Sequence, residues 1–289
     1  MGRLVRNSQT LFAVGSIMRS LWLLLLWVCC LTLAAAEDRS SEDVCGHFEL
    51  YKGSRVGRTQ SFERFTESRH ANRPGQGRRV IVIVPVGDLP SRLDFVRLEQ
   101  FLQAFFQLPV RVEPTRALTP DRGGWAHSTD KYSADYLQWT MRRSMPEDAF
   151  SILALTDVDL YAEDSGPKRL LFGQGHYFNR SAAASLYQLT TSETELLHHR
   201  AFKLVAHELL HTFAMRHCSK FRCLMNSSMS VSSSDARPLH LCPDCLEKLQ
   251  YAVGFDPLQR YRDLERAASA ALSEDELWFS KRRAWLENN

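Results

Sequence analysis

The residues His207-Glu208-Leu209-Leu210-His211-Thr212-Phe213-Ala214-Met215-Arg216-His217 decide the fold of this chain and indicate its chemistry. His207 and His211 are four residues apart, so a helix places both imidazoles on one face. Glu208 lies beside them, whereas His217 can rejoin them only if the helix ends and the chain turns back. Three neutral imidazoles that leave one coordination position open are typical of a catalytic zinc ion. Zinc lowers the pKa of a bound water to roughly 7, so we expect Glu208 to take its proton as the general base.

The chain continues directly into a group of cysteines. Cys218 and Cys223 are separated by four residues, and Cys242 and Cys245 form a C-x-x-C pair farther on. Four cysteines in two close pairs are the usual ligands of a tetrahedral structural zinc ion. The same thiols could form disulfides in an oxidising compartment. A C-x-x-C pair also occurs in redox proteins, but no thioredoxin-like pattern surrounds this one.

Together the two motifs resemble those of the archaemetzincins, zinc metallopeptidases with the pattern H-E-x-x-H-x-x-G-x-x-H-C-x4-C-x-M followed by C-x-x-C. We judge that the resemblance extends over roughly residues 78–265, the size of one domain. It implies one catalytic and one structural zinc ion per chain, Glu208 as the general base, and Met225 as the methionine of the turn beneath the site. It also favours zinc over disulfides at the cysteines. The zinc ligands that it implies are His207, His211 and His217 for the catalytic ion, and Cys218, Cys223, Cys242 and Cys245 for the structural ion.

Two positions depart from the family pattern. Ala214 stands where the family has glycine, three residues after the second histidine. If the turn needs a left-handed backbone at this position, alanine costs on the order of 1 kcal/mol, which strains the turn without forbidding it. The serine-rich segment 226–240 reads as a loop and is about one residue shorter than in the family, a change that loops tolerate.

The apolar pattern predicts an α/β fold, and the resemblance implies that this fold is of metzincin type. Residues 80–86 form a continuous apolar run, which is typical of a strand buried on both faces. Further on, alternating helices and strands predict a mixed, mostly parallel sheet with right-handed crossovers. The expected elements are a helix that opens at Pro90, a strand over 110–112, a helix over 132–145, a strand over 150–155, a glycine-bearing edge over 170–188, and the active-site helix with its HExxH motif over 196–215. A small C-terminal subdomain with the four-cysteine site is expected to hold helices over 242–254, 256–272 and 273–285.

The amino-terminal part of the chain reads as a targeting segment. Residues 21–36 are apolar except for Thr32, follow Arg19 and end in alanines. This pattern is typical of a secretory signal peptide, and the run is short for a membrane span, which needs about 20 apolar residues. We expect 1–36 to be a signal peptide, or an uncleaved signal anchor if Met1 rather than Met18 is the start. Only the uncleaved form would associate with a membrane.

The predicted organisation has three parts: residues 1–36 as the signal, 37–77 as a polar linker or arm, and 78–289 as the metallopeptidase domain. Both readings of the signal place this domain in the lumen of the secretory pathway or outside the cell. A mitochondrial presequence is the alternative, because the segment before residue 21 bears arginine and lacks acids. Cys45 lies in the arm without an evident partner.

Composition and charge exclude some partners. The chain has 289 residues, of which 44% are hydrophobic and 24% charged, an ordinary globular composition. Its net charge of +3 comes from Arg3, Arg6 and Arg19, and the remaining 33 basic residues balance 33 acidic ones. A neutral domain gives no case for nucleic acid or for an anionic membrane surface as a partner. We expect a monomer.

Four further residues are candidates for lesser roles. Asp157 and Asp159 could bind calcium, but we expect them to cap a loop at a strand end. His176 and Tyr177 lie in the segment that is expected to flank the cleft, where either could stabilise the oxyanion. Of the two Asn-x-Ser sequons, Asn179 is the better glycan acceptor.

We interpret the chain as a zinc-dependent metallopeptidase that hydrolyses peptide bonds with Glu208 as the general base. The substrate, a peptide or protein, would lie extended along the edge strand of the sheet. The alternative is a non-catalytic zinc-binding module on the same scaffold, which would have no need of the Glu208 carboxylate. Aminopeptidase and endopeptidase activity both remain open.

Overall fold

The computed structural model of the protein describes residues 47–53, 59–68, 73–75, 77–118, 125, 130–268 and 273–289. Residues His47–Asn289 form one compact unit. The predicted signal segment and Cys45 lie outside the described residues. Among the residues described, no helix is both long and apolar enough to cross a membrane.

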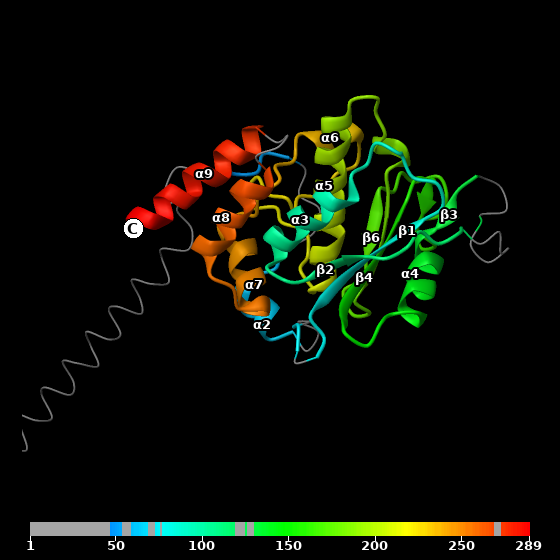
Figure 1. Ribbon diagram of the computed structural model, residues 1–289, viewed down its shortest axis with the longest axis horizontal. Coiled ribbons are helices and arrows are strands. Elements are labelled where there is room, and N and C mark those ends of the chain that lie inside the picture. Colours follow the sequence, from blue (N-terminus) through cyan, green and yellow to red (C-terminus); the bar gives the residue numbers. More distant parts are fainter. Residues whose placement is uncertain are drawn as a thin grey trace, which may run out of the picture. The chain divides into compact units, whose positions relative to one another are not determined.

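A five-stranded sheet with the order β2-β1-β4-β7-β6 forms the centre of the unit (Figure 1). The first four of these strands are parallel, and β6 runs antiparallel to β7 at one edge. The predicted mixed, mostly parallel sheet is therefore confirmed. The strands are β1 (Val80–Val86), β2 (Val110–Val112), β4 (Ala149–Thr156), β6 (Gly173–Gly175) and β7 (Ser181–Ser185).

The central strands are apolar because helices cover both faces of the sheet. Every side chain of β4 is buried, and only the first residue of β1 is partly exposed. Helix α4 (Ala134–Arg143) packs with Leu137 and Met141 on one face. Helices α3 (Phe95–Phe106) and α5 (Thr194–Thr212) lie on the other (Figure 1), where Phe101 of α3 stacks on Phe202 of α5 with ring centroids 4.8 Å apart.

Several predicted helix boundaries were wrong, and side-chain caps or turns explain three of them. Helix α3 begins at Phe95 rather than at Pro90, because the Asp94 carboxylate accepts the backbone N–H groups of Val96 and Arg97. The expected helix over 132–145 is shorter, since Tyr132–Ser133 forms β3, which pairs with β5 (Leu160–Tyr161). The active-site helix α5 ends at Thr212 instead of Met215. A single turn of 3-10 helix, Tyr187–Leu189, precedes it.

The carboxyl-terminal part is helical, as predicted. Helix α7 (Pro243–Val253) begins with proline at its first turn and ends at Gly254, whose φ is 82°. Helices α8 (Pro257–Ala268) and α9 (Ser273–Asn288) follow. The segment 226–240 is not all loop, because it contains the short helix α6 (Val231–Asp235). Ser230 and Ser233 form a capping box that starts this helix.

Parts of the predicted arm pack on the carboxyl-terminal elements. Helix α2 (Phe62–Thr66) carries Phe65, which is fully buried and meets Tyr251 of α7 with ring centroids 6.3 Å apart. Farther upstream, Phe48 packs edge-on against Trp278 of α9. Residues 47–53 and 59–68 therefore contribute to the same core, while the domain boundary at residue 78 stays a prediction.

Candidate metal centre and cleft

Helix α5 carries the first two histidines and passes directly behind the edge strand β6. A Cβ on Gly173 would lie 2.7 Å from Glu208 Cγ, and one on Gly175 would lie 2.2 Å from the Glu208 backbone oxygen and 2.5 Å from His211 Cβ. Since such contacts are too short for any side chain, only glycine lets the strand approach the helix this closely. The two glycines therefore set the distance between the sheet edge and the histidines.

The structure brings His207, His211 and His217 together. One ring nitrogen from each lies within 4.8 Å of the others. The ring centroids are 4.8 Å apart for His207 and His211, 5.2 Å for His207 and His217, and 4.9 Å for His211 and His217. His207 and His211 are buried, and His217 is partly exposed toward the cleft. The three donor atoms converge closely enough for one metal ion.

The turn after α5 returns His217 to the other two histidines. Ala214 has a φ of 66°, in the left-handed region, as expected for the position where the family has glycine. Its N–H donates to the His211 carbonyl at 2.9 Å, and the Met215 N–H donates to the Leu210 carbonyl at 3.4 Å. Two such bonds close a helix end. The left-handed residue therefore explains why the helix ends earlier than the sequence pattern suggested.

Backbone carbonyls fix the orientation of two histidine rings. Nδ1 of His207 lies 2.8 Å from the Leu224 oxygen, and Nδ1 of His211 lies 2.7 Å from the Met215 oxygen. A carbonyl can only accept, so both Nδ1 atoms carry the proton and both Nε2 atoms are left as metal ligands. Nη1 of Arg237 also lies 2.9 Å from His207 Nδ1. Two donors cannot bond to each other, so we assign the Leu224 carbonyl as the hydrogen-bond partner of His207 Nδ1. Arg237 Nη1 is then a close neighbour of this atom without a hydrogen bond to it.

The electrostatic environment keeps the imidazoles neutral. Burial is the largest cause that lowers the pKa of His207, His211 and His217, to about 3 for His211, and the charge of Arg237 lowers it further. Neutral imidazole is the form that binds a metal ion. Burial also raises the pKa of Glu208 to about 8, against the opposing effects of Arg237 and of a hydrogen bond from the Gly175 N–H.

The four cysteines form a second group that fits zinc better than disulfides. One Sγ from each lies within 4.8 Å of the others, and all four cysteines are free and buried. Sγ of Cys218 and Cys242 are 3.8 Å apart, far from the roughly 2.05 Å of a disulfide. Tetrahedral ligands at the roughly 2.3 Å of a zinc–sulfur bond are about 3.8 Å apart. Hydrogen bonds within the group hold the pKa of the Cys218 thiol far below its ordinary value and raise the pKa of Cys242 and Cys245 well above theirs, so without a metal ion the cluster favours a thiolate at Cys218.

The segment between the two groups is tied to both. Leu224 holds His207 through its carbonyl, and the buried Met225 accepts the Cys218 N–H at 2.8 Å. Asn226 follows, with Nδ2 donating to the carbonyls of Cys218 and Phe221. Because this amide is buried and fully used, Asn226 has no room for a glycan in the folded protein.

Hollows lie on both sides of the three histidines. The one beside His207 has a volume of about 260 Å³ and extends between the segment before β6 and residues 227–229. The one beside His211 has a volume of about 370 Å³ and is lined by residues 173–178. Both reach Glu208 and His217. The site therefore lies in the middle of a cleft that runs along the outer side of β6.

Of the two candidates for the oxyanion, the structure places Tyr177 closer to the histidines. Its ring meets that of His211 edge-on with centroids 5.3 Å apart, and it lines the hollow on that side. His176 lines the same hollow, but its Nδ1 accepts the backbone N–H groups of Phe178 and Asn179. His176 thus stabilises its own loop, as a histidine without a catalytic role would.

The two aspartates do not form a metal site among the described residues. Asp159 pairs with Lys131 at 3.0 Å. Asp157 follows β4 and is partly buried, which raises its pKa. One oxygen of each carboxylate is buried without a hydrogen-bond partner, so the expected capping of a loop at the strand end stays a prediction.

Three residues that contact the site were missed in the sequence. Arg237 is buried beside His207 and lines the hollow on that side. Lys203, one helical turn before His207, donates to the carbonyls of Ser234, Asp235 and Arg237. Gln60 reaches the turn at Ala214 from the predicted arm. The sequence holds a signal for Lys203 alone, because a charged residue between Phe202 and Leu204 interrupts an apolar stretch of the helix.

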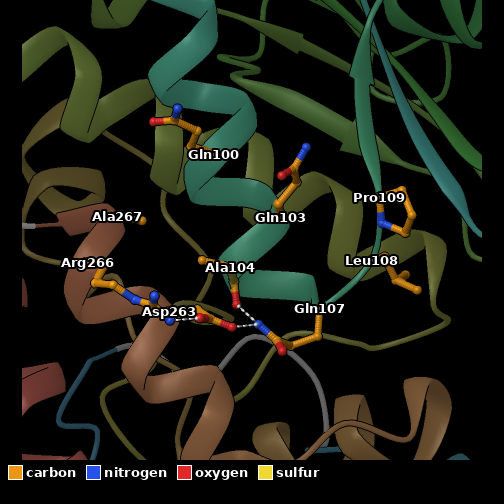
Figure 2. A pocket seen from close by; sticks show the side chains of 9 residues that line it. All are labelled: Gln100, Gln103, Ala104, Gln107, Leu108, Pro109, Asp263, Arg266 and Ala267. Atoms are coloured by element: carbon orange, nitrogen blue, oxygen red, sulfur yellow. Dashed lines mark hydrogen bonds and ion pairs between the residues drawn. The ribbon is translucent and has the colours of Figure 1, made fainter.

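A larger hollow lies away from the histidines. It has a volume of about 700 Å³ and lies between α3 and α8. Figure 2 shows that the Gln107 amide joins its two walls, donating to the Ala104 carbonyl and to the Asp263 carboxylate. The same carboxylate pairs with Arg266. Because these polar groups bond to one another across the groove, we do not consider it the catalytic site.

Comparisons with known proteins agree with the geometry. Residues 129–251 match the sequence profile of peptidase family M54. Human archaemetzincin-2 is 30% identical over 248 residues, which cover 72% of this chain and 68% of the human protein. The archaemetzincin of Pyrococcus furiosus is 29% identical over 191 residues, covering 61% of this chain and 95% of its own.

Solved structures show the same similarity. The crystal structure of archaemetzincin from Methanopyrus kandleri has a TM-score of 0.53 and 28% identity, covering 62% of this chain and 97% of that one. The one from Archaeoglobus fulgidus, complexed with malonate, has a TM-score of 0.50 and 28% identity, covering 58% and 99%. Since similarity of this extent in both sequence and fold marks a common family, this chain belongs to the archaemetzincins and is a zinc metallopeptidase that acts on peptides or proteins.

Proposed function

We propose that His207, His211 and His217 hold the catalytic zinc ion. The convergence of their ring nitrogens carries this proposal. It is supported by the two carbonyls that leave Nε2 of His207 and His211 free, and by the burial that keeps the rings neutral. Zinc bound here would supply a Lewis acid that activates water and polarises the scissile carbonyl.

We further propose that Glu208 is the general base. Its side chain lines both hollows beside the histidines, and a backbone hydrogen bond from Gly175 orients it. A buried carboxyl group with a raised pKa can both accept and return a proton near neutral pH. Glu208 would take a proton from the attacking water and pass it to the leaving amine.

The four cysteines would hold a second, structural zinc ion, so the chain would bind two. The spacing of the Cys218 and Cys242 sulfur atoms supports a metal rather than a disulfide. This ion would fix residues 218–225, which include the carbonyl that orients His207. Its role would therefore be to keep the turn below the catalytic site in place.

The substrate would lie extended along the outer side of β6. Gln174 pairs with Ala183 of β7, and by the alternation of an antiparallel ladder the backbone groups of Gly173 and the carbonyl of Gly175 face outward, while the Gly175 N–H donates to Glu208. An added strand can bond to such an edge. Because hollows flank the histidines on both sides, the cleft has room for substrate residues on both sides of the scissile bond.

We also propose that the protein is secreted or lies in the lumen of the secretory pathway. Expression in a secretory cell should yield a chain that begins near residue 37 and carries a glycan at Asn179. A chain that keeps residues 1–36 in the membrane would indicate the anchor, and one recovered from mitochondria would contradict both.

Substituting Glu208 tests the mechanism. Glu208→Ala should lower peptide turnover by about 10²- to 10⁴-fold, the usual contribution of a general base, while the zinc content stays the same. Glu195→Ala is the matched control, because Glu195 lies on the same helix and its side chain is 55% exposed. Retained turnover in Glu208→Ala would exclude the proposed base, and loss of zinc would show that Glu208 is a ligand.

A further inference from the structure

Arg237 is a buried cation on the wall of the cleft. It is 6% exposed and follows helix α6 in the chain. The hollow that it lines is the one beside His207, which also reaches Glu208 and His217. Arg237 therefore lines the same hollow as the proposed general base and two of the proposed zinc ligands.

The hydrogen bonds of Arg237 are incomplete within the described part of the chain. Nη1 donates to the Asn226 carbonyl at 3.2 Å, whereas Nε is buried without a hydrogen-bond partner. None of the ion pairs found among the described residues includes Arg237. Glu208 attracts it electrostatically but lies too far for an ion pair.

A buried charge without a counter-ion is unusual, because burial removes its hydration. Arginine carries five N–H donors in a planar fork that matches the geometry of a carboxylate. Because Arg237 lines the cleft and keeps one guanidinium donor without a partner, it is suited to receive an anion from a ligand. The loop around Arg237 is held separately, by Lys203, so stabilising that loop does not require the free donors.

The other residues of the hollow suit an acidic group on a short apolar stem. Leu171, Phe172 and Met229 line it beside Arg237. Two carboxyl groups also line the hollow: that of Glu208, which the proposed mechanism assigns to the attacking water, and that of Asp164, which is exposed and accepts the Ser165 hydroxyl at 2.8 Å. Arg169 is a second cation in the lining, and it is exposed. An exposed charge is screened by water and salt, whereas a buried one is not. The buried guanidinium should thus dominate the preference of the hollow.

We propose that this hollow binds a carboxylate of the substrate next to the scissile bond, with Arg237 as its counter-ion. The proposal rests on the proposed cleavage site at the three histidines. The carboxylate can come from an aspartate or glutamate side chain that flanks the bond, or from the carboxyl terminus of the peptide. Both present the same group to the guanidinium, and the experiment distinguishes them.

The first measurement is the cleavage profile of the zinc-loaded wild-type protein on a mixed peptide library, read by mass spectrometry. We expect acidic residues, or free carboxyl termini, to be enriched at one fixed position beside the cleaved bond. Arg237→Gln should abolish this enrichment, and Arg237→Lys should retain part of it. Arg262→Gln is the matched control, because it removes the same charge from an exposed pair with Glu287. It should leave the profile unchanged.

The second measurement is binding without turnover, by calorimetry on zinc-loaded Glu208→Ala. One pair of peptides differs by Asp against Asn beside the bond, and another differs by a free against an amidated carboxyl terminus. One pair should differ in Kd by about tenfold or more, as expected for a charge-assisted hydrogen bond. Which pair differs identifies the source of the carboxylate. The ratio of the two Kd values within a pair does not depend on the fraction of the protein that is folded. A destabilised Arg237 variant can therefore still be tested for this discrimination.

Equal affinities in both pairs, or discrimination that survives Arg237→Gln, would overturn the proposal. The failure of the proposed function looks different, since Glu208→Ala would then keep its turnover or the histidines would lack zinc. Cleavage without an acidic preference would refute only the role of Arg237.

Discussion

The side-chain amide of Gln60 is hydrogen-bonded to both sides of the left-handed turn at Ala214. Nε2 donates to the Ala214 carbonyl, and Oε1 accepts the Arg216 N–H, each at 3.2 Å. The Gln60 carbonyl in turn accepts Lys248 Nζ from helix α7. A residue of the predicted arm thus braces the turn that returns His217 to the other histidines.

Gln60→Ala should loosen this turn. It removes two hydrogen bonds, which contribute about 1–2 kcal/mol in total, and leaves the Ala214 carbonyl and the Arg216 N–H without this partner. We expect weaker zinc retention on dialysis against a chelator and a several-fold lower kcat/KM. Gln259→Ala, which removes an exposed amide on α8, is the control. If Gln60→Ala keeps zinc as tightly as that control, the brace has no influence on the site.

Ala214→Gly should be neutral or stabilising, and should not lower activity. The φ of 66° costs alanine on the order of 1 kcal/mol that glycine does not incur. Part of the gain is offset because glycine is freer in the unfolded chain. Thermal unfolding with saturating zinc, together with turnover of a generic peptide, measures both effects. A clear loss of stability would mean that residue 214 is helical in solution.

Gly175→Ala should disrupt the approach of β6 to α5. The added methyl group would lie within 2.5 Å of His211 Cβ, and overpacking of this kind costs about 1–3 kcal/mol. We expect a lower melting temperature and at least a tenfold loss of turnover, a loss that corresponds to about 1.4 kcal/mol. Gly75→Ala is the control, since no atom lies within 4 Å of the added carbon there. Wild-type activity in Gly175→Ala would show that the strand can move away without consequence.

Lys203→Met should destabilise the segment that carries Arg237. Burial lowers the pKa of Lys203 to about 8, so its ammonium group is still protonated at neutral pH and bonds to three carbonyls. Leaving these carbonyls unsatisfied should cost about 2–4 kcal/mol. Chemical denaturation of Lys203→Met and of the exposed control Lys281→Met measures the difference. Equal denaturation midpoints for the two variants would show that the hydrogen bonds of Lys203 do not stabilise this segment.

Elemental analysis of the purified chain should find two zinc ions. Cys242→Ser should lower the count to one and destabilise the protein, because a structural site contributes to folding directly. The histidine-bound ion should be lost first on dialysis against a chelator. A wild-type count near one, with cysteines that react only after reduction, would show that the four thiols form disulfides.

Local patterns determined much of the fold. The apolar run Val80–Val86 predicted its strand to the residue, and the proline and glycine that bound Pro243–Val253 predicted that helix to within one residue at each end. The spacing of His207, His211 and His217 indicated a shared face and a turn back. The family pattern, which has glycine at this position, indicated the left-handed backbone that Ala214 adopts. In the other cases the signal lies in the side chains of neighbouring residues, where the backbone preference is set.

Only the tertiary structure decided what lies around the histidines. Gly173 and Gly175 are required by the approach of a helix that comes about 30 residues later, and Gln60 meets Ala214 across 154 positions. The buried position of Arg237 beside His207 depends on Lys203 and on the cap of α6. A sequence records the type of each residue, but burial and an unpaired charge arise from contacts between distant segments. The ligand motif could therefore be recognised from the sequence alone, whereas the residues that orient the ligands and select the substrate could not.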